Sequence, residues 1–575
     1  MLPRHAVAVV LGAFLAAASG CRTTAGVREE PPEIEYALEW LEGDEPRVLA
    51  TLRATGEADG TTEFGLITGW GGVPDGGEWI REVRAESREG RELALEPLGN
   101  ARFVAAHEPG ERVTLRWELA PLADEGYDRS NEYRPLVRKA LVHVIGNTGL
   151  LTPLALRDAD VPSTIEFDWR GFEREGWSCA SSHGLGARVA VRCPLSEFLQ
   201  AVFLAGDVEL ERREVPGGEL IVAAPRDSEA VELSALADAT AAIVRAERTF
   251  FADTTQPYYF VSALPMGAPE AHGFSLGGTG LTDSFALFYQ RGASLADDSP
   301  TREPLLSVLA HEHFHNWCGL AIAPEGTEQL AYWFTEGFTS FYTGRMLRAA
   351  RLATEEQRRR EVDEALARYW KSPARGETNA VIAERFWTDR DVGELPYQRG
   401  FVVALALDAE MRRASGGTRT LDDGMRELLA EARATGERFT TEELLARFER
   451  WTSAEVARSL AELIERGGVL EPDPMSWGVF GDLCTCPAYA LDPGFDVETT
   501  MEQRIVFGVR QGSAAWKAGL RDGQKLAGLS YAGSANIPVS MTVVDRGQRR
   551  ALEFLPCGPL LAVPYFEPRP DSQEP

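Results

Sequence analysis

The pattern of hydrophobic and polar positions changes twice along this chain. From about residue 34 to residue 225, short segments such as 48–52 and 113–119 alternate hydrophobic and polar residues between frequent glycines and prolines, which is typical of antiparallel β structure. A segment with helical spacing follows at 229–251, then a strand-like segment at 258–264, and helical patterns dominate from residue 301 to about residue 471. Beyond Pro472 short strand-like segments return, with one helix-like insert at 513–517. The sequence therefore predicts an α+β multidomain protein.

These changes divide the chain into a signal peptide (1–20), a tether (21–33), an N-terminal β domain (34–225), a mainly helical domain (226–471), a smaller β domain (472–567) and a tail (568–575). In the helical domain, Pro304 can occupy the first turn of a helix that continues through His311. The other helices predicted there are 229–251, 328–350, 355–369, 400–413, 421–434 and 454–466.

Length and composition narrow the classes of function. The chain has 575 residues, 44% hydrophobic and 26% charged, which allows several domains and excludes a fully disordered chain or a polytopic membrane protein. The formal net charge of -29 repels phosphate backbones. We therefore expect no nucleic-acid partner, and we interpret the charge as a solvated acidic surface.

The N-terminus has the features of an export signal. Arg4 and His5 precede an apolar run at 6–18, which is too short to span a bilayer and predicts cleavage. The sequence Ala18-Ser19-Gly20-Cys21 resembles the lipobox of bacterial lipoproteins, with Ala18 where leucine is usual. The resemblance implies that Cys21 is acylated and anchors the protein in the bacterial cell envelope, facing the periplasm or exterior. The alternative is secretion without a lipid.

Six cysteines remain after Cys21, and an even number suits an oxidising compartment. Cys179 and Cys193 flank a short turn-rich stretch and could pair. Cys557 could pair with Cys484 or Cys486.

Three of the eight histidines in the chain, His311, His313 and His315, fall within five residues. On a helix His311 and His315 share one face, and Glu312 lies about 60° around from His315, so the segment matches the HExxH pattern of zinc peptidases. The alternatives are a surface helix with chance histidines, or a strand that places all three histidines on one face. Leucines at 305, 306 and 309 follow a helical period and favour the catalytic zinc site.

Catalytic zinc needs a third protein ligand, because it takes three and leaves a position for water. Glu336 is the candidate. It lies among Trp333, Phe334 and Phe338, where a second helix can return past the first and where an ordinary glutamate would need a cationic partner.

The chain resembles the gluzincin metallopeptidases and, among them, the glycyl aminopeptidase-like family with a C-terminal PDZ domain. The similar segments are 311–317 (HEHFHNW), 333–339 (WFTEGFT), 396–400 (PYQRG), 404–408 (ALALD) and 421–423 (LDD). The resemblance implies a thermolysin-like zinc peptidase domain at 226–471 and a PDZ-like domain at 472–567. It also assigns to Tyr397 the stabilisation of the tetrahedral intermediate.

One motif departs from the family pattern. Related aminopeptidases bind the substrate's α-amine with a glutamate on the strand beside the active site, whereas this chain has Gly277-Gly278-Thr279-Gly280-Leu281-Thr282-Asp283. Thr282 aligns with the glutamate and cannot pair with an ammonium, and Asp283 would point to the other face of a strand. Aminopeptidase specificity is therefore in question, while the backbone around Gly278 and Gly280 could still bind an extended peptide.

The segment 512–523 (GSAAWKAGLRDG) resembles part of bacterial PDZ domains, although Gln524 replaces the usual aspartate. We therefore expect an exported, lipid-anchored peptidase with one Zn²⁺ per chain, whose Glu312 activates the zinc-bound water for attack on peptide or protein substrates. Two alternatives stay open, a non-catalytic peptide-binding protein and an endopeptidase in place of an aminopeptidase. The sequence leaves the oligomeric state undetermined.

Overall fold

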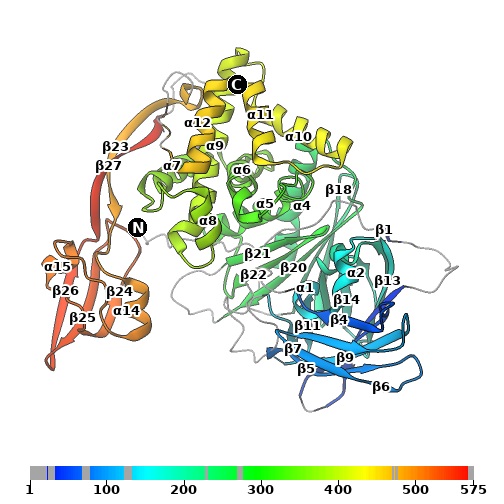
Figure 1. Ribbon diagram of the computed structural model, residues 1–575. Helices are drawn as coiled ribbons and strands as arrows, with labels where there is room; N and C mark the ends of the chain where they lie inside the picture. Colours follow the sequence, from blue (N-terminus) through cyan, green and yellow to red (C-terminus); the bar gives the residue numbers. More distant parts are fainter. Residues whose placement is uncertain are drawn as a thin grey trace.

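The computed structural model describes residues 22–23, 33–43, 45–67, 78–121, 133–226, 231–267, 276–468, 470, 472 and 477–567 (Figure 1). The predicted signal peptide, Cys21 and the tail at 568–575 lie outside these residues. Within the described part, none of the helices is both long and apolar enough to span a membrane. The α+β multidomain prediction is confirmed, with β sheets first, a helical region next and further β sheets last.

Three sheets form the N-terminal β region, where strands such as β13 alternate buried and partly buried residues as one-sided sheets do. The first has the order β1 (Arg22–Thr23), β16 (Arg188–Cys193), β13 (Ser163–Arg170), β2 (Ile34–Leu41), β3 (Arg47–Thr55), β9 (Arg112–Leu119), β5 (Ile80–Glu86) and β6 (Glu92–Leu93). The second has β10 (Leu136–Arg138), β11 (Leu141–Ile145), β17 (Val202–Gly206), β14 (Ser178–Ser181) and β15 (Gly184–Leu185), and the third β12 (Thr152–Pro153), β4 (Thr61–Gly65), β8 (Arg102–Ala106) and β7 (Leu95–Gly99). The short helices are α1 (Gly146–Gly149), α2 (Leu154–Asp158) and α3 (Leu195–Leu199).

A further sheet lies between this region and the helices (Figure 1). Its order is β18 (Val208–Val215), β19 (Gly218–Pro225), β20 (Tyr258–Met266), β22 (Ser284–Gln290) and β21 (Leu276–Leu281). Strands β19, β20 and β22 are parallel, whereas β18 and β21 pair antiparallel, and β21 forms one edge. Because β18 and β19 precede residue 226, this sheet continues across the boundary predicted at 225/226.

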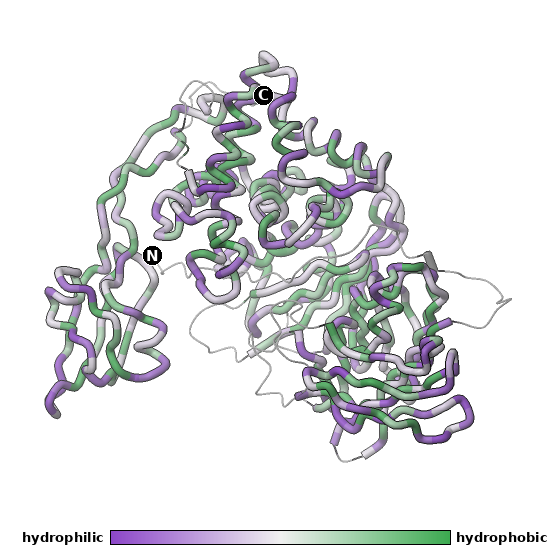
Figure 2. Tube along the Cα trace, viewed as in Figure 1, coloured by the Kyte–Doolittle hydropathy of each residue, from purple (hydrophilic) through white to green (hydrophobic). Residues whose placement is uncertain are grey.

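Hydrophobic packing joins this sheet to the helices that cover it. The shared core contains side chains from β20, β22, α4 (Leu233–Phe251) and α5 (Arg302–Phe314), and Figure 2 shows the hydrophobic residues concentrated along these central strands. Helix α5 carries the HExxH segment, so hydrophobic packing of this helix against the sheet fixes the position of the segment.

The helical region follows most of the predicted spans, with α6 (Glu328–Ala349), α7 (Glu355–Lys371), α10 (Leu421–Thr435) and α12 (Ala454–Arg466) close to their predicted bounds. The helix predicted at 400–413 is wrong at its start, because α9 (Arg390–Ser415) begins at Arg390 and contains Pro396. Its N-cap Asp389 accepts a hydrogen bond from the Val392 N–H, which starts the helix ahead of the proline. Two helices were not predicted, α8 (Asn379–Arg385) and α11 (Thr441–Trp451).

The C-terminal part begins with η5 (Gly478–Phe480) and a long two-stranded ribbon of β23 (Asp482–Leu491) and β27 (Cys557–Glu567). The ribbon carries a small unit of α14 (Val497–Gln503), α15 (Ala514–Ala518), β24 (Lys525–Ser530), β25 (Val539–Asp545) and β26 (Gln548–Phe554). The Phe566 N–H donates to Asp363 on α7 at 2.9 Å, which attaches the ribbon to the helical region.

None of the cysteine pairings that the sequence left open is present among the described residues, where all six cysteines are free. Cys179 lies on β14 and Cys193 on β16, which belong to different sheets. Across the ribbon, Cys484 lies opposite Tyr565 and Cys486 opposite Val563, whereas Cys557 lies opposite Leu491 at the far end.

Candidate metal centre

Three predicted ligands converge between α5 and α6. His311 Nε2 lies 3.2 Å and His315 Nε2 3.4 Å from Glu336 Oε2. One ligand atom from each residue lies within 4.8 Å of the others, and all three residues are buried. The predicted grouping of His311, His315 and Glu336 as one metal site is confirmed. Two imidazoles and a carboxylate are the ligands of a known class of catalytic zinc site.

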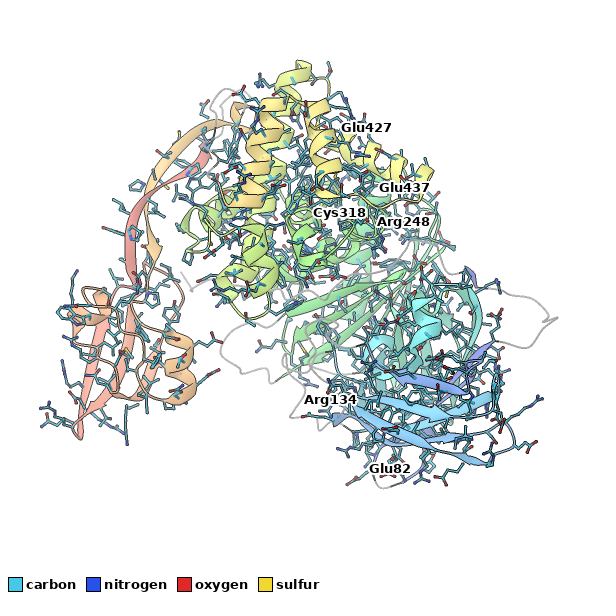
Figure 3. All side chains as sticks on the ribbon, in the orientation of Figure 1. Glu82, Arg134, Arg248, Cys318, Glu427 and Glu437 are labelled. Carbon is cyan, nitrogen blue, oxygen red and sulfur yellow. The ribbon has the colours of Figure 1, made fainter. Side chains whose placement is uncertain are left out.

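The hydrogen bonding of His315 directs a lone pair toward the same point. Its Nδ1 lies 2.9 Å from the carbonyl oxygen of Cys318, which can only accept, so Nδ1 carries the proton and Nε2 is left as a ligand. Cys318 is among the helices in Figure 3, in the turn after α5. This backbone contact orients the ring as metal-binding histidines require.

The protonation states also suit a metal. Burial lowers the pKa of His311, so its imidazole is neutral near pH 7. Burial by itself would lower the pKa of His315 too, but attraction to Glu336 raises it, and a bound cation would favour the neutral ring. Burial by itself would raise the pKa of Glu336, but attraction to His315 and hydrogen bonds from His311 and His315 lower it to about 2. A neutral imidazole and an ionised carboxylate are the forms that coordinate metals. The residues present therefore fit zinc.

Glycines let helices α6 and α9 approach each other closely. A Cβ placed on Gly337 would lie 2.2 Å from the Gly400 Cα, and one placed on Gly400 would lie 1.9 Å from the Trp333 carbonyl oxygen. Only glycine fits at either position. Because Gly337 follows Glu336 and Gly400 comes one turn after Tyr397, this contact brings the predicted oxyanion donor beside the ligands.

Tyr397 lies next to His311, with 6.2 Å between the ring centroids. Burial raises the pKa of Tyr397 well above its ordinary value, and the charges of Glu336 and Glu312 add to the effect. The phenol therefore keeps its proton and can donate a hydrogen bond over the whole physiological pH range.

Glu312 is fully buried on α5 and lies against the edge strand β21. A Cβ placed on Gly278 would be 3.0 Å from the Glu312 Cγ and 3.2 Å from its Oε1. The bare backbone of Gly278 therefore passes directly beside the carboxylate, as the sequence prediction of a peptide-binding strand requires.

The other predicted substrate residues lie further along this hairpin. Thr282 and Asp283 come four and five positions after Gly278, in the two-residue turn that joins β21 to β22. The Thr282 N–H donates to the Gln200 carbonyl at 2.8 Å, and Asp283 accepts from Gln256 Nε2 at 2.8 Å. Burial raises the pKa of Asp283 to about 6. The Thr282 hydroxyl donates to the Glu197 carbonyl at 3.3 Å, so both side chains have hydrogen-bond partners other than Glu312.

A buried polar pair behind α5 was missed from the sequence. His313 points away from the metal ligands, and its Nδ1 lies 2.6 Å from Glu247 Oε2 on α4, with both residues fully buried. Burial raises the pKa of Glu247 well above its usual value. Nothing in the local pattern at 247 signals this contact, because it joins helices that are distant in sequence.

Comparisons with known proteins found one matching family model and several similar solved structures. Residues 304–388 match the model of the M61 glycyl aminopeptidase family. Among solved structures, an aminopeptidase N family protein from Idiomarina loihiensis is similar with a TM-score of 0.71 at 17% identity, covering 92% of this chain and 98% of that chain. An M1 zinc metallopeptidase from Deinococcus radiodurans has a TM-score of 0.45 at 16% identity, covering 80% of this chain and 97% of its own. No curated protein matches significantly.

Proposed function

We propose that this chain, a metallopeptidase of the glycyl aminopeptidase family by its match over residues 304–388, hydrolyses peptide bonds with Glu312 as general base and Tyr397 as oxyanion donor. The observation that carries the proposal is the convergence of His311, His315 and Glu336 beside these two side chains. Zinc held by the three ligands supplies a Lewis acid that polarises water and the scissile carbonyl.

Glu312 moves the proton in this mechanism. Its carboxylate accepts a proton from the attacking water as the new C–O bond forms, and returns it to the amide nitrogen as the C–N bond breaks. The site is buried, so the charges act in a low effective dielectric and are not screened by bulk water. The products are a carboxylate and an amine.

The first expected result concerns Tyr397. Its hydroxyl would donate to the oxyanion that develops on the carbonyl oxygen, and loss of one such donor typically lowers kcat by about 10²- to 10³-fold. Tyr397→Phe should therefore lower kcat by that factor while zinc content and KM change little. Steady-state kinetics and metal analysis of the purified variant measure these quantities. An unchanged kcat would make Tyr397 a packing residue only.

The peptide substrate would lie along β21. An extended chain can add to an exposed sheet edge through its backbone hydrogen bonds, and Gly278 places this edge against Glu312. Gly278 and Gly280 are two positions apart and so face the same side of the strand. Neither carries a side chain that could bind an α-amine.

Activity should therefore depend only weakly on a free N-terminus. A charge-assisted hydrogen bond to a carboxylate contributes roughly 1.5 to 3 kcal/mol, and without it kcat/KM for free and N-acetylated peptides should differ by less than about tenfold. A library of paired free and blocked peptides measures the ratio. A strong preference for free N-termini that Asp283→Asn abolishes and Thr282→Val preserves would instead assign amine binding to Asp283.

The same library separates the rival functions when it is combined with a zinc assay. A non-catalytic peptide-binding protein would bind zinc and peptides without cleaving either peptide set. An endopeptidase would cleave internal bonds in blocked peptides, whereas an aminopeptidase would release single N-terminal residues. Cleavage that requires bound zinc supports the peptidase.

Two further parts of the proposal are supported by sequence resemblance. A PDZ-like role for the C-terminal unit is supported by the segment 512–523, which includes the short helix α15 and the left-handed Gly519 that ends it. Export with acylation of Cys21 is supported by the lipobox-like residues before it. An intact mass that corresponds to an unmodified N-terminus beyond Cys21 would exclude the lipid anchor.

A further inference from the structure

Tyr133 reaches the catalytic strand from the N-terminal β region. Its side chain is 4% exposed, and its hydroxyl donates to the Gly278 carbonyl at 3.2 Å across 145 positions of sequence. The tyrosine ring packs edge-on against Phe288 of β22, with centroids 5.7 Å apart. Figure 3 labels the next residue, Arg134, at the margin of the β region near the central sheet. A residue outside the helical domain thus contacts the strand beside Glu312.

The backbone of the N-terminal β region holds Tyr133 firmly. Thr148 Oγ1 donates to the Tyr133 carbonyl at 2.6 Å, and the Trp79 indole N–H donates to the Thr148 carbonyl at 2.7 Å. Tyr133 is also close enough to Tyr397 to influence its pKa. The two tyrosines come from different parts of the chain, Tyr133 from the N-terminal β region and Tyr397 from α9.

The acceptor that Tyr133 contacts belongs to the edge of β21 that faces away from β22. In an antiparallel pair, successive residues direct their backbone groups alternately toward the partner strand and away from it. The Gly278 carbonyl accepts from Tyr133, and the Thr282 N–H, four residues on, donates to the Gln200 carbonyl. Both partners come from outside the five-stranded sheet, so the even-numbered positions face away from β22.

We propose that Tyr133 is a gate on the peptide-binding edge, whose hydroxyl holds the Gly278 carbonyl that an extended peptide needs beside Glu312. A substrate strand added to this edge would donate a backbone N–H to the same carbonyl. Peptide binding then replaces or weakens the Tyr133 hydrogen bond. This inference rests on the proposed function, because it takes β21 as the peptide-binding edge.

The gate has an energetic consequence that a packing residue would not have. A neutral hydrogen bond contributes a modest net free energy, so its removal should strengthen peptide binding by about 2- to 10-fold. Tyr133→Phe keeps the ring against Phe288 and removes only the hydroxyl.

The test measures binding without turnover. Tyr133→Phe and a control variant are each made in zinc-loaded Glu312→Gln protein. The dissociation constant of tetra-alanine is then measured by calorimetry. Tetra-alanine is suitable because its backbone can pair with a strand and its side chains are small. Tyr133→Phe should lower this dissociation constant by about 2- to 10-fold.

Tyr36→Phe is the matched control. Tyr36 is 2% exposed in the same β region, and its hydroxyl also donates to a backbone carbonyl at 3.2 Å, that of Leu151. The two variants should lose similar thermal stability, but Tyr36→Phe should leave the dissociation constant unchanged. Equal or weaker binding by Tyr133→Phe, with binding intact in the control, would overturn the gate alone. Failure of the Glu312→Gln protein and of both variants to bind the peptide would overturn the peptide-binding edge and the gate with it.

Discussion

Glu312→Gln is expected to retain one zinc per chain and to lose hydrolysis. The amide preserves the shape of the side chain but cannot accept a proton from water, and general-base catalysis contributes about 10²- to 10⁴-fold. Glu312 is fully buried and lies against Gly278, so no bulk water can replace it at that position. The kcat on the best library peptide and the zinc content of the same preparation are the measurements.

A glutamate on the same helix provides the control. Glu303 lies in the first turn of α5, and its side chain is about half exposed. Glu303→Gln should keep both zinc and kcat near the wild-type values. Turnover by Glu312→Gln at the wild-type rate would place the chemistry on another residue.

Glu336→Ala is expected to remove zinc from a protein that still folds. Glu336 supplies the only negative charge among the three converging ligands, and its Oε2 lies within 3.4 Å of both histidine nitrogens. Loss of a residue that merely orients a ligand costs about 10- to 100-fold in metal affinity, so loss of a ligand should exceed that range. Competition with a zinc chelator measures the affinity, and hydrolysis should fall with it.

Glu336→Gln is expected to weaken zinc binding less than Glu336→Ala does. The amide oxygen can still coordinate but carries no charge, so its zinc affinity should lie between the wild-type and Glu336→Ala values. Circular dichroism checks that both variants retain the helices. Stoichiometric zinc in folded Glu336→Ala would show that a different residue completes the site.

The sequence by itself determined the parts of the site that depend on local periodicity. His311 and His315 are four residues apart on a segment with a helical pattern, so their common face follows from the geometry of one turn. Glu336 lies in the next helix, and its carboxylate among aromatic residues required a partner that only a metal or a cation could supply. The resemblance over these segments also pointed to the glycyl aminopeptidase-like family, whose model matches residues 304–388, and to the order of the β and helical regions.

Only the tertiary structure decided what depends on contacts between distant segments. The start of α9 was misjudged because Pro396 reads as a helix breaker, whereas Asp389 caps the helix ahead of it. Strands β19 and β20, which α4 connects in the sequence, pair in parallel. No pattern in either strand indicates which strand it pairs with. The tertiary structure likewise placed Gly278 against Glu312 and Thr282 against Gln200, contacts that no alignment could supply.

Contacts between distant segments also determine which residues surround the metal centre. Glu247 reaches His313, and Tyr133 reaches Gly278, through hydrogen bonds that span 66 and 145 positions of sequence. Hydrophobic periodicity records which face of an element is buried, but it does not record which polar group that face will meet. Those partners are chosen when the sheet, the helices and the N-terminal β region pack together, because buried donors and acceptors must be satisfied by whatever the packing brings within reach.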